Sequence, residues 1–372
     1  ILWEKPVAEM RRIGALRDSG NMVLTDDLLY CASGSECLAL DVYTGEEKNR
    51  VSLPSGYSPE VYEWGYLASV GSGVIGSTVK KGTVLREMSF KTIYSGAYGD
   101  NTTIAYSDAI FAKDRHDGKG HWIYKGKGGI CNPSIAVSES RVFFIESRDP
   151  KTLDMETYRL DYPKFLGGAG GDLVCLDLRS GQELWRQPFE APSNIETLFL
   201  LTKDDHVVLS TSRNQKAEGA KSLTVHYELR CYQSANGRLE WEQARNHGKR
   251  PNGSHGEQDL HPAIVGDRII AEPHIYELKS GKEVGRFDRA GYGCGTISAS
   301  ARSLYFRAGN LATFDLEKSA KDTITNVNRS GCWINMIPAS GLLLVPEGSS
   351  GCICGYPVQG SMGFAPGSNV EK

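Results

Sequence analysis

A short motif recurs along the chain and constrains its fold more than any other feature. In each copy an apolar strand leads into an acidic or polar turn that ends in glycine, and a second short strand, often closing on tryptophan, follows. The copies lie at residues 40–45, 113–122, 175–185, 231–241 and 276–281, with a degenerate sixth at 314–319. Six copies predict a protein built by repeating one supersecondary unit.

The chemistry of the motif is that of a β-hairpin. Asp, Ser and Thr side chains hydrogen bond back to the backbone, Gly adopts positive φ, and the tryptophan covers the edge of the neighbouring unit. Two β-rich runs precede each copy, as in 263–270, where Gly266 and Asp267 form a tight turn. Each unit therefore has four strands, which predicts an all-β fold, a β-propeller of four-stranded antiparallel blades.

The two ends of the sequence decide the expected number of blades. A seventh unit without the glycine turn spans 332–338, 341–345 and 352–358, and Ile1-Leu2-Trp3 matches Glu183-Leu184-Trp185 at the end of a unit. Residues 1–372 are therefore expected to form one propeller domain of seven blades, with residues 1–6 as the closing strand. The alternative is eight blades, with residues 1–6 as the remnant of a blade from a longer parent that carries other domains.

These repeats resemble the PQQ-like propeller superfamily, which includes quinoprotein dehydrogenases and BamB-like outer-membrane assembly proteins. The C-terminal third, at 293–300, 331–335 and 350–354, resembles a subfamily frequent in planctomycete-type bacterial genomes. The resemblance implies a fold but no particular activity. Quinoprotein dehydrogenases carry an adjacent cysteine pair beside their quinone, and this sequence has no Cys-Cys dipeptide and no Cys-x-x-Cys-His haem motif, which argues against PQQ as a cofactor.

Charge and cysteine content narrow the classes of function and compartment. The formal net charge is −3 with no long basic run, which argues against a nucleic-acid partner. No stretch reaches the roughly 18–20 apolar residues of a membrane span, and the first residues lack the features of a signal peptide. Nine cysteines are many for a reduced cytosolic protein, so the expected location is periplasmic or secreted.

The geometry of an antiparallel blade predicts which face of the molecule works. The start of the first strand, the turn between the second and third, and the end of the fourth all lie on one face. Long insertions fall at such positions, at 81–106, 147–171, 213–221 and 245–259. Because loops on a rigid scaffold are where binding residues concentrate, this insertion-rich face is the expected site of a protein partner or a carbohydrate ligand.

Several polar residues are expected to meet on that face beside the propeller axis. Cys131, His261, Cys294 and Cys332 are predicted to open first strands. The candidate ligand-binding residues are Arg245, His247, His255, His261, Arg307, Asn310 and Glu347. The leading hypothesis is an exported propeller that binds a ligand or partner through these residues.

The cysteines leave three alternatives open. His261, Cys294, Cys332, Cys352 and Cys354 are candidate ligands for a metal ion, with copper, zinc, iron or calcium considered. Alternatively, Cys294, Cys332, Cys352 and Cys354 form disulfides, or they are plain packed thiols. Cys31, Cys37, Cys175 and Cys231 are expected in the core.

The alternative hypothesis is that the protein is an enzyme whose active site lies on the same face. His255, His261, Tyr292 and Arg307 supply an acid, a base and a carboxylate-neutralising cation, which a polysaccharide lyase needs to abstract a proton beside a uronate carboxyl group. A metal-dependent catalyst is the second form of this alternative. No Gly-x-Ser-x-Gly, His-Glu-x-x-His or phosphate-loop motif occurs in the sequence.

Overall fold

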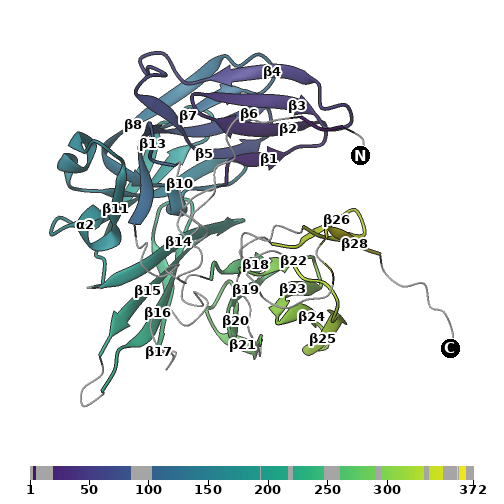
Figure 1. Cartoon of the computed structure of the whole chain (residues 1–372). Helices are drawn as coiled ribbons and strands as arrows, with labels where there is room; N and C mark the ends of the chain where they lie inside the picture. The colour runs from purple at the N-terminus through teal and green to yellow at the C-terminus, as the bar shows by residue number, and fades with distance from the viewer. Residues whose placement is uncertain are drawn as a thin grey trace. The chain divides into compact units, whose positions relative to one another are not determined.

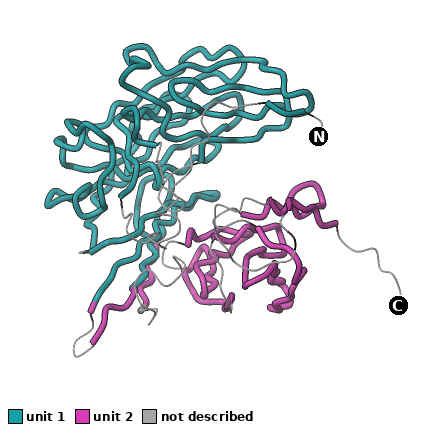
Figure 2. The backbone as a smooth tube through the Cα atoms, viewed as in Figure 1, with its two compact units in different colours: residues 1–87, 101–215, 226–239 teal, residues 88–100, 216–225, 240–372 magenta. Residues whose placement is uncertain are grey.

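The computed structural model describes most of the chain as two compact units. The described residues are 3–5, 20–84, 103–192, 194–216, 221–246, 260–289, 295–330, 335–346, 358 and 360–365. Unit 1 comprises residues 1–87, 101–215 and 226–239, and unit 2 comprises 88–100, 216–225 and 240–372 (Figure 2). No helix among the described residues is long and apolar enough to cross a membrane.

The first blade of unit 1 is a four-stranded antiparallel sheet. Its strands are β1 (Met22–Leu24), β2 (Leu28–Ser33), β3 (Glu36–Asp41) and β4 (Glu47–Ser52), paired in chain order (Figure 1). Alternate residues of β2 and β3 point into a core that contains Tyr30 and Ala39, both fully buried. The sequence expectation of four consecutive antiparallel strands is confirmed here.

The second and third blades are joined in one nine-stranded sheet, which the repeat pattern did not predict. The second blade consists of β5 (Tyr62–Val70), β6 (Gly73–Lys80), β7 (Thr103–Asp114) and β8 (Gly120–Cys131); the third consists of β9 (Ala136–Val137), β10 (Arg141–Ser147), β12 (Gly171–Asp177) and β13 (Glu183–Phe189). Near its end, β8 leaves its own blade and pairs with β10, through Ile130 and Glu146. Cys131 therefore ends a fourth strand rather than opening a first strand, which corrects the sequence expectation.

Glycine makes this crossing of β8 feasible. The strand passes so close to β10 that a Cβ atom on Gly128 would lie 2.2 Å from the carbonyl oxygen of Ser147. On Gly129, a Cβ atom would lie 2.6 Å from the ring of Tyr106. A side chain at Gly128 would force β8 away from β10, and one at Gly129 would clash with Tyr106 on β7 of its own blade.

The insertion at 147–171, expected as a loop, has structure of its own. It contains the 3₁₀ helix η3 (Pro150–Asp154), β11 (Arg159–Asp161) and the short helix α2 (Tyr162–Leu166). Asp149 caps η3 and Asp161 caps α2 through their side chains, and a proline lies at the first or second position of each helix. Strand β11 pairs with the start of β7 and thereby fixes the insertion to the second blade.

The remaining sheets continue the repeat. The strands β14 (Ile195–Lys203), β15 (His206–Gln215), β16 (Thr224–Gln233) and β17 (Leu239–Asn246) form a four-stranded sheet. In unit 2, one four-stranded sheet contains β18 (Ala263–Val265), β19 (Arg268–Ala271), β20 (His274–Glu277) and β21 (Glu283–Arg286). A second four-stranded sheet contains β22 (Ser298–Ala299), β23 (Ser303–Ala308), β24 (Asn310–Asp315) and β25 (Ala320–Thr325). A three-stranded sheet contains β26 (Ile337–Ala339), β27 (Leu342–Val345) and β28 (Met362–Phe364). The prediction of an all-β fold built from four-stranded antiparallel blades is confirmed, and the number of blades stays a prediction.

The repeated turn has the chemistry expected from the sequence. Its glycines adopt positive φ, from 67° at Gly118 to 71° at Gly237. In the copy at Asp177, the carboxylate accepts hydrogen bonds from the backbone N–H and the hydroxyl of Ser180, at 2.8 and 2.7 Å. The degenerate sixth copy has Ser319 in place of glycine, with φ of 52°. The turn conformation is therefore kept even where its preferred residue is absent.

Tryptophan joins one blade to the next in the way the sequence predicts. The Trp122 ring covers Gly181 of the following blade, and its indole N–H donates to the carbonyl of Leu178 at 2.7 Å. Trp185 and Trp241 make the corresponding bonds to Ser234 and Leu278, both at 2.9 Å. Each accepting carbonyl belongs to the residue three before the turn glycine.

Where the fourth strand of a blade lacks this tryptophan, another side chain donates a hydrogen bond to the equivalent carbonyl of the next blade. The hydroxyl of Tyr30 donates to the carbonyl of Arg115 at 3.2 Å, and Arg268 donates to that of Leu316 at 2.7 Å. Trp3 covers Gly45 and donates to the carbonyl of Val42 at 2.8 Å. Trp3 therefore contacts the first blade as a fourth-strand tryptophan contacts the blade that follows it.

Candidate functional site

Most of the residues singled out from the sequence lie outside the described part of the chain. These are His247, His255, Tyr292, Glu347, Cys294, Cys332, Cys352 and Cys354. The metal, disulfide and lyase hypotheses all depend on members of this group, and they stay predictions.

The four described candidates of unit 2 are held in separate local contacts. Arg245, on β17, bonds to the Tyr276 hydroxyl and to the carbonyl of Ala271, and its guanidinium lies over the Tyr276 ring. Asn310 bonds to Asn326 at 3.1 Å.

The other two candidates are more enclosed. Arg307 is 4% exposed on β23. One ring nitrogen of His261 lies 2.6 Å from the carbonyl oxygen of Pro262, and burial lowers the pKa of this histidine. It is therefore neutral near pH 7.

The described cysteines are core residues. Cys31, Cys37, Cys131, Cys175 and Cys231 are all buried, and no disulfide joins any two of them. Burial raises the pKa of the Cys131 and Cys175 thiols to about 12, so neither is a thiolate near neutral pH. Within the described ranges, no three His, Cys, Asp or Glu side chains gather in a way that would hold a metal ion.

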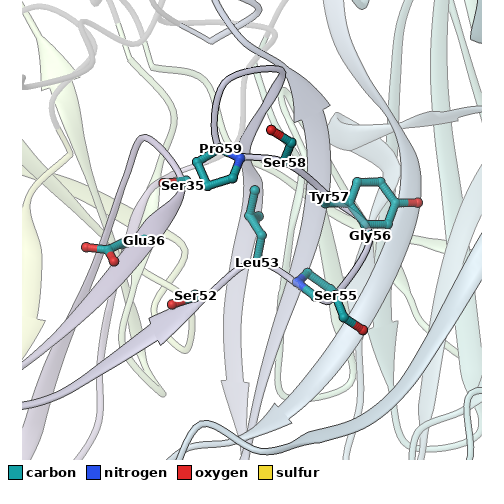
Figure 3. A pocket seen from close by; sticks show the side chains of 10 residues that line it. Ser35, Glu36, Ser52, Leu53, Ser55, Gly56, Tyr57, Ser58 and Pro59 are labelled. Carbon is teal, nitrogen blue, oxygen red and sulfur yellow. The ribbon is translucent and has the colours of Figure 1, made fainter.

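The described surface features of interest lie instead in unit 1, at the strand ends that the blade geometry predicts. An open pocket of about 480 Å³ lies beside the β2–β3 turn and the loop that follows β4 (Figure 3). Its lining is rich in hydroxyl groups, with Leu53 at its centre; it comprises Ser35, Glu36, Ser52, Leu53, Pro54, Ser55, Gly56, Tyr57, Ser58 and Pro59. The Glu36 carboxylate pairs with Arg50. This pocket is large enough for one or two amino-acid side chains.

Tyr57 joins the pocket to a second feature, which we call the tyrosine–aspartate cluster: Tyr57, Tyr62, Thr78, Asp108 and Tyr158. The rings of Tyr57 and Tyr62 meet edge to face, with centroids 4.8 Å apart. The Thr78 hydroxyl donates to one carboxylate oxygen of Asp108, and the Tyr158 hydroxyl lies 3.5 Å from the other. Four separate segments thus surround one carboxyl group with hydroxyl groups.

The electrostatics of the cluster are set by burial. Desolvation raises the pKa of Asp108 above its ordinary value, and hydrogen bonds from Thr78, Tyr158 and Tyr62 oppose this rise only in part. Burial likewise raises the pKa of Tyr57, and the neighbouring Asp108 charge adds to this effect. Strongly perturbed groups on an accessible surface are typical of functional sites.

Exposed apolar and cationic side chains extend the cluster outward. Val61 and Met155 are 47% and 40% exposed. Lys80, which pairs with Tyr62 across the strands, bonds to the carbonyl of Met155 and lies over the Tyr158 ring, 4.9 Å from its centroid. We refer to the pocket, the tyrosine–aspartate cluster, Val61, Lys80 and Met155 together as the strand-end surface.

The insertion holds its part of this surface firmly. The Tyr106 hydroxyl donates to the carbonyl of Thr152 at 2.9 Å, and the Thr152 hydroxyl accepts from the backbone of Gly129 at 2.7 Å. The backbone of Tyr106 bonds to that of Tyr158 at 3.0 Å. The surface is therefore preorganised, which lowers the entropy cost of binding.

Sequence reasoning predicted this end of the strands but missed the cluster. Its members come from a loop, three strands and an insertion, and their separation along the chain hides their proximity. Tyrosine is also an ordinary strand residue. The one available signal was a tyrosine-rich loop and strand start, at Tyr57 and Tyr62, next to a predicted insertion.

Comparisons with known proteins agree with the fold. A family model for the outer membrane protein assembly factor BamB matches residues 164–292. The outer membrane protein assembly factor BamB of Burkholderia pseudomallei (strain K96243) is 22% identical over 302 residues, which cover 77% of this chain and 71% of that protein. The predicted resemblance to PQQ-like, BamB-like propellers is confirmed.

Two solved structures are also similar. BamB from Moraxella catarrhalis has a TM-score of 0.48 and 12% identity, covering 86% of this chain and 78% of that one. Quinohemoprotein alcohol dehydrogenase from Comamonas testosteroni has a TM-score of 0.47 and 11% identity, covering 91% and 65%.

Proposed function

We propose that this PQQ-like, BamB-like propeller is a partner-binding protein of the bacterial envelope, and that its protein partner binds the strand-end surface of unit 1. The observation that carries the proposal is that a pocket, an aromatic pair and exposed apolar side chains lie together on one rigid surface. The enzyme alternative depends on His255 and Tyr292, which lie outside the described residues, and it stays a prediction.

The composition of the strand-end surface supports a protein partner. Tyrosine and methionine are enriched in the cores of protein interfaces, where they supply large contact area at low entropy cost. Tyr57, Tyr62 and Met155 lie here next to a pocket that can receive an anchoring side chain. Such a pocket with an aromatic wall is where binding energy concentrates in an interface.

The relatives support the kind of role and the compartment. The relative from Burkholderia pseudomallei is called an outer membrane protein assembly factor, a name that implies a role alongside other proteins. By similarity, this chain is proposed to act in the periplasm or outside the cell. Fold alone would not support this step, because propellers serve many functions.

Site-specific photo-cross-linking tests the proposal. A photoreactive amino acid replaces Met155 on the strand-end surface or, as a control of similar exposure, Leu184 on β13, where 48% of the residue is exposed. After irradiation of cells of the native host, the Met155 position is expected to give a discrete protein adduct, identified by mass spectrometry. The Leu184 position is expected to give none.

A variant with an added charge tests whether the cross-linked partner binds through the strand-end surface. Met155→Asp places a charge among the contacts and is expected to weaken binding of the purified partner by at least tenfold, while Leu184→Asp leaves it unchanged. Equal adducts at both positions, or none at Met155, would refute the proposed function.

A further inference from the structure

We propose that the tyrosine–aspartate cluster is a recognition site for a cationic side chain, arginine or lysine, supplied by the partner protein. This inference rests on the proposed function and deepens it, because it names the chemical group that the strand-end surface receives. The essential observation is a partly buried carboxylate whose described neighbours are neutral hydroxyl groups, whereas Glu146 and Glu272 each lie beside an arginine.

Two buried or partly buried acids elsewhere in the described structure show the contrast. Glu146 is 1% exposed and lies 2.6 Å from the Arg186 guanidinium. Glu272 lies 2.9 Å from Arg289, which is itself buried. Cations compensate the desolvation of these carboxylates.

Asp108 has no such compensation. Its described neighbours are Thr78, Tyr62 and Tyr158, all of which offer hydroxyl groups, and no ion pair reaches it within the described ranges. Lys80 is the nearby cation, but its amine bonds to the carbonyl of Met155 and lies over the Tyr158 ring. The carboxylate is therefore partly desolvated and keeps an unmet preference for a positive charge.

The rings around Asp108 suit the same kind of ligand. Tyr57 and Tyr62 pack edge to face with their centroids 4.8 Å apart, so a group that binds this pair contacts it from outside and does not enter between the rings. A guanidinium or ammonium group gains from an aromatic face as well as from a carboxylate, and gains more when water is excluded. A neutral or anionic side chain would leave Asp108 uncompensated.

The stability of an Asp108 variant separates a binding role from a structural one. The pKa of Asp108 is raised on folding, so the charged form is less favourable in the folded state than in the unfolded state. Asp108→Asn keeps an acceptor for Thr78 and removes that charge. We expect the urea midpoint at pH 7 to stay the same or rise, whereas a carboxylate kept for stability would make it fall.

Binding of model peptides tests recognition directly. The probes are two blocked, fluorescently labelled peptides, acetyl-(Gly-Arg)₄-amide and the same peptide with citrulline, which has the shape of arginine without its charge. By fluorescence anisotropy, the wild-type chain is expected to bind the arginine peptide at least tenfold more tightly. Asp108→Asn is expected to remove most of this preference, and Tyr57→Leu to reduce it.

A matched control removes the same charge elsewhere in the same blade. Asp117, in the β7–β8 turn, is exposed and paired with Lys119. Asp117→Asn is expected to keep the preference for arginine. If Asp108→Asn keeps it as well, or the wild-type chain shows none, the inference is overturned.

The two proposals fail in different ways. A partner that cross-links at Met155 but binds Asp108→Asn as tightly as the wild type would remove the cationic-site inference and leave the proposed function standing. Absence of any adduct at Met155 would remove the proposed function itself.

Discussion

Single residues hold neighbouring blades together through one repeated contact. Trp122 and Trp185 each cover a turn glycine of the following blade and donate an N–H to a carbonyl three residues before it. Tyr30 and Arg268 reach the equivalent carbonyl in blades where tryptophan does not. The hydrogen bond to this carbonyl thus recurs from blade to blade, and the side chain that donates it varies.

Substitution of Trp185 measures this contact. Trp185→Ala removes both the packing on Gly237 and the hydrogen bond to Ser234, and is expected to lower the free energy of unfolding by about 3 kcal/mol. Trp185→Phe keeps a ring and is expected to cost about 1 kcal/mol. Urea denaturation measures both, with the exposed neighbour Leu184→Ala as the control. Equal values for Trp185→Ala and Leu184→Ala would contradict the proposed role of the ring.

The turn aspartates make part of the stability depend on pH. The Ser180 hydroxyl and backbone N–H hold the pKa of Asp177 below its ordinary value. Because the folded pKa is the lower one, this contribution is complete above the unfolded pKa of about 3.9 and is lost as the pH falls through the folded pKa. Asp177→Asn is expected to lower the urea midpoint at pH 7 and to approach the wild type below about pH 4. A midpoint difference that is the same at pH 3 and pH 7 would count against this explanation.

The repeated turn was predictable at this scale, and the tyrosine–aspartate cluster was not. Asp, Ser and Gly determine the turn through contacts within a few residues, so the sequence pattern specifies it directly. Tyr57 and Tyr158 meet Asp108 only because two blades and an insertion converge. No local pattern encodes such a meeting.

At the scale of elements, the unexpected feature is the strand β8, which serves two blades. Its glycines allow the close approach to β10, and an ion network then joins the two. Arg186 on β13 pairs with Glu146 and with Asp172 at 2.6 and 2.9 Å, and the backbone of Lys127 on β8 donates to Glu146 at 2.8 Å. The sequence repeat predicted separate blades because the repeated motif shows the order of the strands but not where each strand ends.

Breaking this network tests its contribution. Arg186→Met leaves the buried Glu146 charge without its cation and is expected to cost about 3 kcal/mol of unfolding free energy. The double variant Arg186→Met/Glu146→Gln removes the stranded charge as well and is expected to be more stable than Arg186→Met alone. Calorimetry or urea denaturation compares the two, and a double variant that is less stable than the single one would show that the buried charge is not the cause.

At the scale of the whole molecule, the sequence led to a propeller with one insertion-rich face, and the described structure supports the architecture. The functional residues predicted near the axis remain untested, because most lie outside the described residues. The strand-end surface of unit 1 lies at the strand ends that blade geometry selected, but with different residues. Chain topology therefore predicts the strand ends at which the proposed surface lies, while packing between distant segments determines the chemistry of that surface.

A hydrogen-exchange footprint of the complex with the partner identified at Met155 tests the central claim most directly. Amides of 53–63, 78–84 and 150–160, which carry the strand-end surface, are expected to exchange more slowly when the partner is bound. Amides of the turns at 42–46, 115–119 and 178–182, at the opposite ends of the strands, are expected to be unchanged. Protection confined to those turns, with none on the strand-end surface, would contradict the claim.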